Sequence, residues 1–411
     1  MVRVTDMTHG RPIRLILLFS LPLMLGSVFQ QLYTIVDTII IGRGVGMQAL
    51  ASIGAADWIN WLVLWGLQGF TQGFAILAAQ EFGAGAYDRL RRVLAMIVKL
   101  SCWFGIAVTI ISLLLVRPLL TLLHTDPAVF GGAQTYLYVQ FGGSLIIIAY
   151  NMAAAVLRCL GDSRTPLFAI IAASFANIAL DLLFVMGFGW GIFGASFATV
   201  LAQLIAFLLC LRSLRRLPFV QLTKADWKTD PAILLHLCRL GIPTGLQMSM
   251  ITLGGMVLQS VLNGFGVVFV AGYTAANKLY GILESASVAF GYAMTAYMGQ
   301  NRGARNAARI DAGIRAVLVL SAEFTAAIVT AMLLAGKPLL GLFLSTEEAG
   351  AADALAVAYQ YLMVLMVFLF ALFLLQAYRS SLQGLGEMTV PTLSGFAEML
   401  MRMGAALVLP T

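Results

Sequence analysis

Residues 21–42 read LPLMLGSVFQQLYTIVDTIIIG, an apolar run that holds one carboxylate, Asp37. A run this long and apolar predicts a transmembrane helix. A charged carboxylate inside a bilayer costs roughly 2.5 to 3.5 kcal/mol on insertion scales, so such residues usually face a bundle interior or a wet cavity. Asp37 is therefore a candidate for ion or substrate binding. The alternative is that it only pairs with a neighbouring helix or is solvated near the interface.

The composition extends this interpretation to the whole chain. Of its 411 residues, 61% are hydrophobic and 10% are charged, which is far more apolar than a soluble domain. Eleven apolar runs are long enough to span a membrane, at approximately residues 13–41, 50–77, 93–116, 134–157, 166–187, 191–213, 240–262, 267–293, 314–336, 357–380 and 390–409. None alternates in polarity as a transmembrane β-strand does. The sequence predicts an all-α polytopic membrane protein.

The basic residues indicate the orientation of the chain. With the N-terminus in the cytoplasm, the loops on that side carry 19 of the 25 Lys and Arg residues, and the opposite loops carry three. An excess of positive charge marks cytoplasmic loops, so we expect a cytoplasmic N-terminus. The formal charge of +7 then reflects membrane topology and not nucleic-acid binding.

The second half of the chain repeats landmarks of the first half about 220 residues later. The pairs are Pro22 with Pro243, Arg117-Pro118-Leu119-Leu120 with Lys337-Pro338-Leu339-Leu340, and Leu160-Gly161-Asp162 with Leu385-Gly386-Glu387. Six spans bring a chain back to its starting side, so we expect two parallel halves related by an axis along the membrane normal. The predicted halves are residues 1–214, with spans 1–6, and 232–411, with spans 7–11, joined by a cytoplasmic linker at 215–231. By this alignment a twelfth span is missing.

Four polar residues of the first half are predicted to lie at one depth in the outer part of the membrane. They are Asp37 on the first span, Asn177 and Asp181 on the fifth, and Thr199 on the sixth. Asn177 and Asp181 share one helix face because they are four residues apart. These side chains suit a hard cation such as Na⁺, or a pair of carboxylates that holds a proton. The alternative is a hydrogen-bonded strut between the three helices.

Other polar residues fall within the predicted spans. Candidates for substrate binding are Gln30, Tyr33, Tyr136 and Asn151. In the second half, Glu398 and Arg402 have the i,i+4 spacing of a structural ion pair. Lys278 and Glu284 are six residues apart, so each needs another partner.

Several classes of function lack their signature. No GxxxxGK[ST] loop is present, which argues against an ATP-driven pump. Cys102, Cys159, Cys210 and Cys238 show no CxxC spacing, so we expect free thiols and no metal bound through them. The sequence indicates no cofactor besides a coupling ion and no enzymatic activity.

Several segments resemble the multidrug and toxic compound extrusion (MATE) family of cation-coupled antiporters. They are LPLMLGSVFQQLYTIVDTIIIGRGVG, AAQEFGAGAYDRLRRV, NMAAAVLRCLGDSRTP, NIALD and GIFGASFAT, with weaker echoes in MGQNRGARN and LQGLGEMTVP. The resemblance implies that Asp37, Asn177, Asp181 and Thr199 form the coupling site. The second-half segments GIPTGLQMSMI and FLFALFLLQAYRSSLQGLG carry no carboxylate, so the chain resembles the damage-inducible (DinF-like) branch, whose cation site lies in the N-terminal half.

We therefore expect a bacterial inner-membrane exporter that exchanges H⁺ or Na⁺ for amphipathic, often cationic organic compounds. It would act as a monomer among membrane lipids, with no nucleic-acid partner. One alternative is a lipid-linked oligosaccharide flippase of the same superfamily, which needs cationic residues for a diphosphate; the spans hold few Lys and Arg. A second is an intramembrane transferase, but the outer loops offer only scattered carboxylates.

Overall fold

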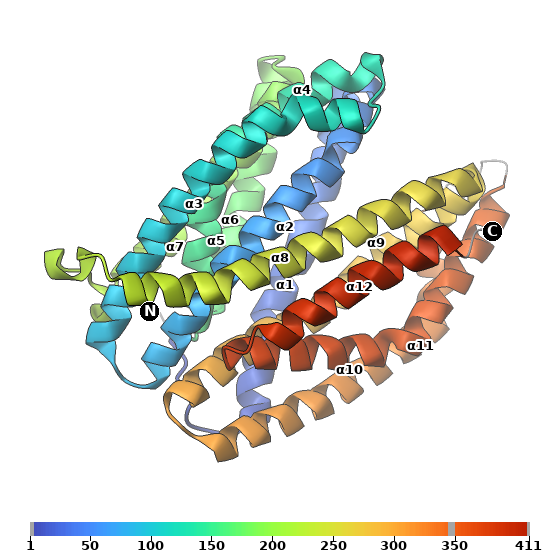
Figure 1. Ribbon diagram of the computed structural model, residues 1–411. Coiled ribbons are helices and arrows are strands. Elements are labelled where there is room, and N and C mark those ends of the chain that lie inside the picture. The colour runs from blue at the N-terminus through green and yellow to red at the C-terminus, as the bar shows by residue number, and fades with distance from the viewer. Residues whose placement is uncertain (1–3, 344–349, 409–411) are drawn as a thin grey trace.

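The computed structural model describes residues 4–343 and 350–408, which form α-helices and no strand (Figure 1). The first half contains α1 (Pro12–Gly44), α2 (Met47–Gly83), α3 (Tyr87–Leu122), α4 (Pro127–Gly142), α5 (Ser144–Cys159), α6 (Arg164–Asp181) and α7 (Gly191–Arg215). The second half contains α8 (Pro231–Leu262), α9 (Val267–Gly303), α10 (Ala307–Gly341), α11 (Ala351–Gly384) and α12 (Thr389–Val408). The prediction of an all-α polytopic protein is confirmed.

Each predicted apolar run coincides with a helix or a pair of helices. The run at 134–157 forms the pair α4 and α5, which bend by 50° at their junction. By length and apolarity, eight described helices could cross a membrane, or nine when this bent pair counts as one span. The other two runs form α9 and α12, which do not meet the same criteria of length and apolarity. Both carry charged residues, Lys278 and Glu284 on α9 and Glu398 and Arg402 on α12.

Several helices extend well beyond their apolar runs. α8 begins at Pro231 and not near residue 240, and α9 continues from residue 293 to Gly303. Hydropathy marks only the apolar part of such a helix, while local signals set its end. At the start of α8, the Asp230 carboxylate accepts hydrogen bonds from the backbone N–H groups of Ala232 and Ile233, and Pro231 occupies the first turn.

Two groups of helices, blue to green and yellow to red, correspond to the two halves and cross at a large angle in Figure 1. The repeat is visible in equivalent helices: Pro22 lies inside α1 and Pro243 inside α8, while Pro118 lies inside α3 and Pro338 inside α10. The halves meet mainly where α2 packs against α8 and α9, and where α1 packs against α9. Hence α1 and α2 carry most of the contact with the second half.

The crossing of α2 and α8 depends on small residues. A Cβ atom added at Gly69 would lie 2.7 Å from the carbonyl oxygen of Thr244, and one added at Gly73 would lie 2.6 Å from the Cα of Gly241. Small residues let helix backbones approach closely, and dispersion contacts then replace the hydrophobic effect that is missing between helices in lipid. This crossing fixes how the halves sit against each other.

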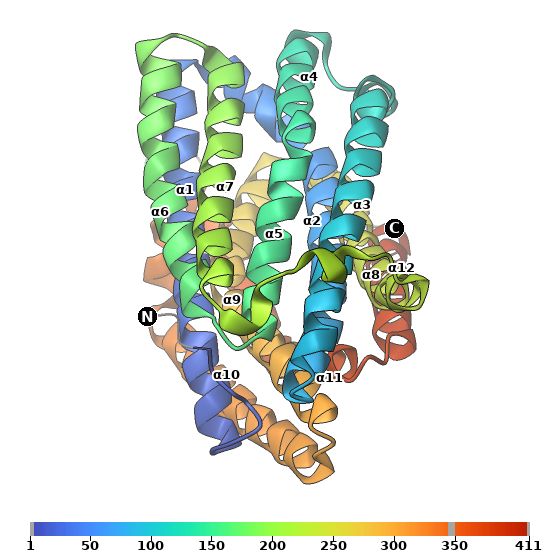
Figure 2. The ribbon, with the colours of Figure 1, turned by 90° about the vertical axis from the view of Figure 1, so that its left-hand side faces the viewer.

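The segment between the halves is ordered against the first half (Figure 2). It contains two short 3₁₀ turns, η2 (Pro218–Val220) and η3 (Lys224–Trp227). From α3, the ammonium group of Lys99 donates hydrogen bonds to the carbonyl of Trp227 at 2.6 Å and to the hydroxyl of Thr229 at 2.9 Å. These bonds hold the end of the segment directly before α8 begins.

Candidate cation and substrate site

The backbone changes its helical form at Asp181. α6 ends at this residue and continues as a π-helical turn, η1 (Leu182–Gly187). A π turn inserted at the end of an α-helix is a rare feature that frequently accompanies a functional site. Asn177 and Asp181, one α-helical turn apart, are 1% and 0% exposed. Both side chains therefore point into the interior of the first half.

Asp37 on α1 lies opposite Asp181 on α6. The two helices pack together, and the two carboxyl groups interact electrostatically. The phenol of Tyr33, one helical turn before Asp37, interacts electrostatically with both carboxylates. The structure thus brings the two predicted acidic residues together, although 144 positions separate them in the sequence.

The polar atoms of this cluster lack hydrogen-bond partners among the described residues. They are one carboxylate oxygen of Asp37, both carboxylate oxygens of Asp181, the amide oxygen and nitrogen of Asn177, and the amide oxygen of Gln203. A buried polar group left unsatisfied costs about 1 to 3 kcal/mol, and more when it is charged. Clustered carboxylate and amide oxygens are the ligands that hard cations take, and a shared proton also relieves repulsion between two carboxylates.

A small pocket lies beside this cluster, between α1, α5, α6 and α7. Its walls include four residues of the sequence prediction, Gln30, Tyr33, Asn177 and Thr199. The other lining residues are Tyr150, Ile170, Ala173, Ser174, Ala202, Gln203 and Ala206. The Thr199 hydroxyl donates to the carbonyl of Ala195 at 3.2 Å, which leaves its oxygen able to act as an acceptor toward the pocket.

The two remaining substrate candidates are placed differently. Tyr136 on α4 accepts a hydrogen bond from the Asn60 amide at 3.3 Å and interacts with Tyr33 and Asp37. Asn151 on α5 donates to the carbonyl of Ile147 on its own helix at 2.9 Å and is not among the residues that line the pocket. Tyr136 therefore lies with the carboxylates, whereas Asn151 does not.

Sequence reasoning missed two residues of this region. Asp57, half-buried on α2, interacts electrostatically with Asp37 and Tyr136. It is a lone carboxylate inside the apolar run 50–77, so the argument that singled out Asp37 applies to it equally. Gln203 follows Thr199 by one helical turn on α7 and lines the pocket. The i,i+4 spacing to Thr199 was the available signal.

A separate charged network lies in the second half. Glu398 accepts from Arg402 at 2.7 Å, which confirms the predicted i,i+4 ion pair, and its other oxygen accepts from Arg379 on α11 at 3.0 Å. The Arg379 side chain is 6% exposed and also donates to the Ser394 hydroxyl at 3.0 Å. Glu284 interacts electrostatically with Arg402 and Glu398. Among the described residues, Lys278 forms no ion pair.

We predict that Glu398→Gln destabilises the protein. The substitution leaves the buried Arg379 guanidinium without an ionised partner, and breaking a buried ion pair costs about 3 to 5 kcal/mol. Arg402→Gln is the comparison, because the Arg402 side chain is 41% exposed. When Arg402 is replaced, Glu398 still pairs with Arg379. Thermal unfolding in detergent should show a clearly lower melting temperature for Glu398→Gln than for Arg402→Gln. Equal melting temperatures for wild type and Glu398→Gln would contradict this account.

Comparison with known proteins supports a transporter. The model of the MatE family matches residues 22–183 and 243–408, one stretch in each half. The probable multidrug resistance protein YpnP of Bacillus subtilis is 33% identical over 88% of this chain and 80% of its own length. The probable multidrug resistance protein NorM of Thermotoga maritima is 25% identical over 92% of this chain and 81% of its own length.

Solved structures show the same fold. A multidrug resistance MATE family transporter in an outward-facing conformation superposes with a TM-score of 0.90 at 24% identity, covering 99% of this chain and 90% of its own. A MATE protein in complex with MaL6 gives a TM-score of 0.88 at 23% identity, covering 99% and 97%. Since the family model covers both halves, this chain is a multi-pass membrane protein that belongs to the MatE family of multidrug efflux transporters.

Proposed function

We propose that this protein is an antiporter that exports amphipathic, often cationic organic compounds in exchange for H⁺ or Na⁺. The two halves, residues 1–214 and 232–411, move against each other so that the site opens to one side of the membrane at a time. Support comes from the bacterial relatives, which are named as multidrug resistance or export proteins. The coupling ion and the class of substrate are inferred from the site itself.

One observation carries the proposal: one carboxylate oxygen of Asp37, both carboxylate oxygens of Asp181 and the Asn177 amide are buried without hydrogen-bond partners among the described residues. Such a site favours any cation that replaces the missing donors, whether a proton, Na⁺ or the charged group of a substrate. Two cations that compete for one anionic site cannot occupy it together. Competition of this kind, combined with alternating access, produces exchange.

We place the coupling ion at Asp37, Asn177, Asp181 and Thr199, and the substrate beside it at Gln30, Tyr33 and Tyr136. The first three ion-site residues offer unsatisfied polar atoms, and Thr199 lines the adjoining pocket. Asn151 remains a candidate only if α5 moves, because its amide is bonded within its own helix. This arrangement puts the coupling site in the N-terminal half, as in the DinF-like branch.

We propose a cytoplasmic N-terminus in a bacterial inner membrane. The distribution of Lys and Arg between the two sets of loops supports this orientation. The proposal takes the monomer as the working unit because the candidate site lies entirely within one chain.

The test is uptake of a fluorescent cationic dye into everted membrane vesicles. We expect dye uptake when a pH or Na⁺ gradient of the correct direction is imposed across the vesicle membrane. We expect this uptake to collapse when an ionophore dissipates the gradient. Vesicles without the protein provide the background. Gradient-independent uptake, or none with either ion across a panel of amphipathic cations, would contradict cation-coupled export.

A further inference from the structure

The two halves are joined by a matched pair of hydrogen bonds at the end of the bundle that holds the turns 83–86, 160–163, 303–306 and 385–388. We call this the joined end. Gln80 on α2 and Gln300 on α9 occupy equivalent positions of the repeat. The Gln80 amide donates to the carbonyl of Gly384 at 3.1 Å, and the Gln300 amide donates to the carbonyl of Cys159 at 3.0 Å. Each glutamine thus links its own half to the other.

Glycines bring the backbones together beside these bonds. A Cβ atom added at Gly83 would lie 1.9 Å from the carbonyl oxygen of Gln300, and one added at Gly303 would lie 1.8 Å from the carbonyl oxygen of Gln80. Gly83 and Gly303 are also equivalent positions of the repeat. Since any side chain would push these backbones apart, the joined end is a tight closure between α2 and α9.

An arginine contacts the residue that follows each glutamine, Glu81 after Gln80 and Asn301 after Gln300. Arg89 on α3 lies 3.0 Å from the Glu81 carboxylate, and Arg309 on α10 donates its Nε–H to the Asn301 amide oxygen, also at 3.0 Å. Here the symmetry ends. The side chain of Arg89 is 58% exposed, whereas Arg309 reaches into the N-terminal segment.

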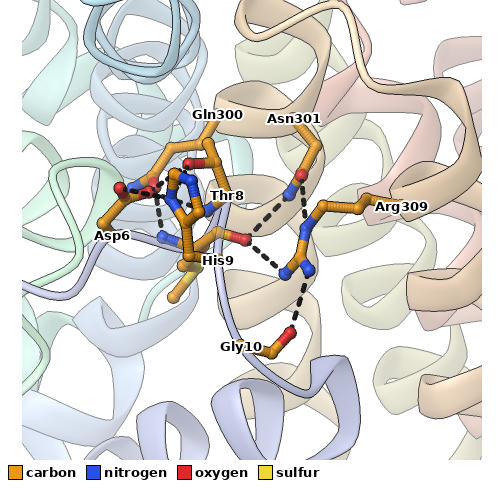
Figure 3. Close-up of polar contacts among 8 residues, drawn as sticks. Asp6, Thr8, His9, Gly10, Gln300, Asn301 and Arg309 are labelled. Carbon is orange, nitrogen blue, oxygen red and sulfur yellow. Dashed lines mark hydrogen bonds and ion pairs between the residues drawn. The ribbon is translucent and has the colours of Figure 1, made fainter.

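Residues Thr5–Gly10, which we call the strap, are held by the second half (Figure 3). The Met7 N–H donates to the Gln300 side-chain oxygen at 2.8 Å, and the Met7 carbonyl accepts from Asn301 at 3.1 Å and from Arg309 at 2.9 Å. Arg309 also donates to the Gly10 carbonyl at 2.9 Å. Met7 is fully buried and belongs to an apolar cluster built mainly from α9, α10 and α11.

The strap is bonded to the first half as well. The Thr5 N–H donates to the carbonyl of Gly161, at the turn that follows α5, at 3.1 Å. Gly161 has φ +90°, and a Cβ there would lie 2.1 Å from the Thr5 carbonyl oxygen, so this approach requires glycine. Val4, directly before the strap, packs against a buried cluster that lies mostly in the first half. Within four residues the chain therefore contacts both halves.

We propose that the strap is a latch that holds the two halves together at the joined end and must be released when that end opens. The inference rests on the proposed alternating-access function and adds the element that controls one of its two gates. By donating to the Gln300 amide oxygen, the Met7 N–H orients that amide so that its nitrogen faces the Cys159 carbonyl. The strap thus supports the Gln300 bond directly, and Gln80 has no equivalent support from the strap.

The test compares Arg309→Gln with Arg89→Gln, its counterpart in the repeat. Both changes remove one guanidinium of similar position, but only Arg309 binds the strap. Spin labels at Asp88→Cys and Ala308→Cys, exposed residues on either side of the joined end, report its opening by pulsed electron resonance in a cysteine-free background. Because Arg309→Gln loses charge-assisted bonds to the strap, we expect about a tenfold larger population at long distance. Arg89→Gln should match the parent protein.

Deletion of residues 4–6 is the second variant, because it removes the Thr5 bond and no helical residue. It should shift the distances in the same direction as Arg309→Gln. The latch is overturned if both variants keep the parental distances, or if Arg89→Gln opens the joined end as much as Arg309→Gln. Distances are measured without substrate or gradient, so a protein that opens on release of the strap but transports nothing would retain the latch and reject the proposed function.

Discussion

Asp37→Asn is expected to abolish gradient-driven export while the protein still inserts and folds. The substitution keeps the size of the side chain and removes the charge that faces Asp181. Without that charge the site can no longer exchange a cation for a proton. Insertion should be unchanged or slightly better, since a carboxylate in the membrane costs roughly 2.5 to 3.5 kcal/mol on insertion scales. Dye uptake into everted vesicles, normalised to the amount of folded protein, measures the effect.

The matched control is Asp311→Asn, the same chemical change at an exposed position on α10. It should leave transport at the wild-type rate. Because the two variants differ only in location, a loss confined to Asp37→Asn assigns the effect to the site. Export at wild-type rates by Asp37→Asn would show that the central role given to Asp37 is wrong.

Binding of Na⁺ to the purified protein is expected to weaken as the pH falls. In the proposed site, Asp37, Asn177, Asp181 and Thr199 supply oxygens for the ion, and the charge that attracts it comes from the two carboxylates. A proton taken up by the pair removes part of that charge, so H⁺ and Na⁺ compete for one site. Isothermal titration with Na⁺ at several pH values should show the affinity decreasing steadily toward acid. An affinity independent of pH would contradict a shared site.

The same titration separates the contributions of single residues. Asp181→Asn and Asn177→Ala should each weaken Na⁺ binding, and loss of both Asp37 and Asp181 should eliminate it. The control in the second half is Glu323→Gln, an exposed carboxylate on α10. Glu398 is unsuitable because it holds two arginines. Na⁺ binding that survives in the protein without Asp37 and Asp181 would place the ion elsewhere, with Glu284 the next residue to test.

Local rules were enough to predict much of this molecule. Apolar runs of membrane-spanning length located every helix, because lipid requires each span to satisfy its own backbone hydrogen bonds. The i,i+4 rule placed Asn177 with Asp181 and Glu398 with Arg402 on shared faces. The cost of a charge in lipid singled out Asp37. Each of these inferences uses residues within one helix.

Other features that depend on contact between distant segments escaped prediction. Arg379 and Glu398 are 19 positions apart on different helices, so no helical spacing connects them. The strap lies outside the apolar runs and is held by Asn301 and Arg309, about 300 residues away. Hydropathy also stops short of the polar helix ends, where Gln80 and Gln300 join the halves. Asp57 is different, because the cost of a charge in lipid, which singled out Asp37, applies to Asp57 equally. Only its interactions with Asp37 and Tyr136 needed the structure.

The central claim is that the carboxylate pair of the first half couples cation movement to export. The most direct measurement is cation flux driven by substrate alone, in proteoliposomes that begin without an ion gradient. When an outward substrate gradient is imposed, wild-type protein should drive ²²Na⁺ or protons in the opposite direction, and Asp37→Asn and Asp181→Asn should not. Equal cation flux in wild type and in both variants, or substrate movement with no opposing flux in the wild type, would contradict the account.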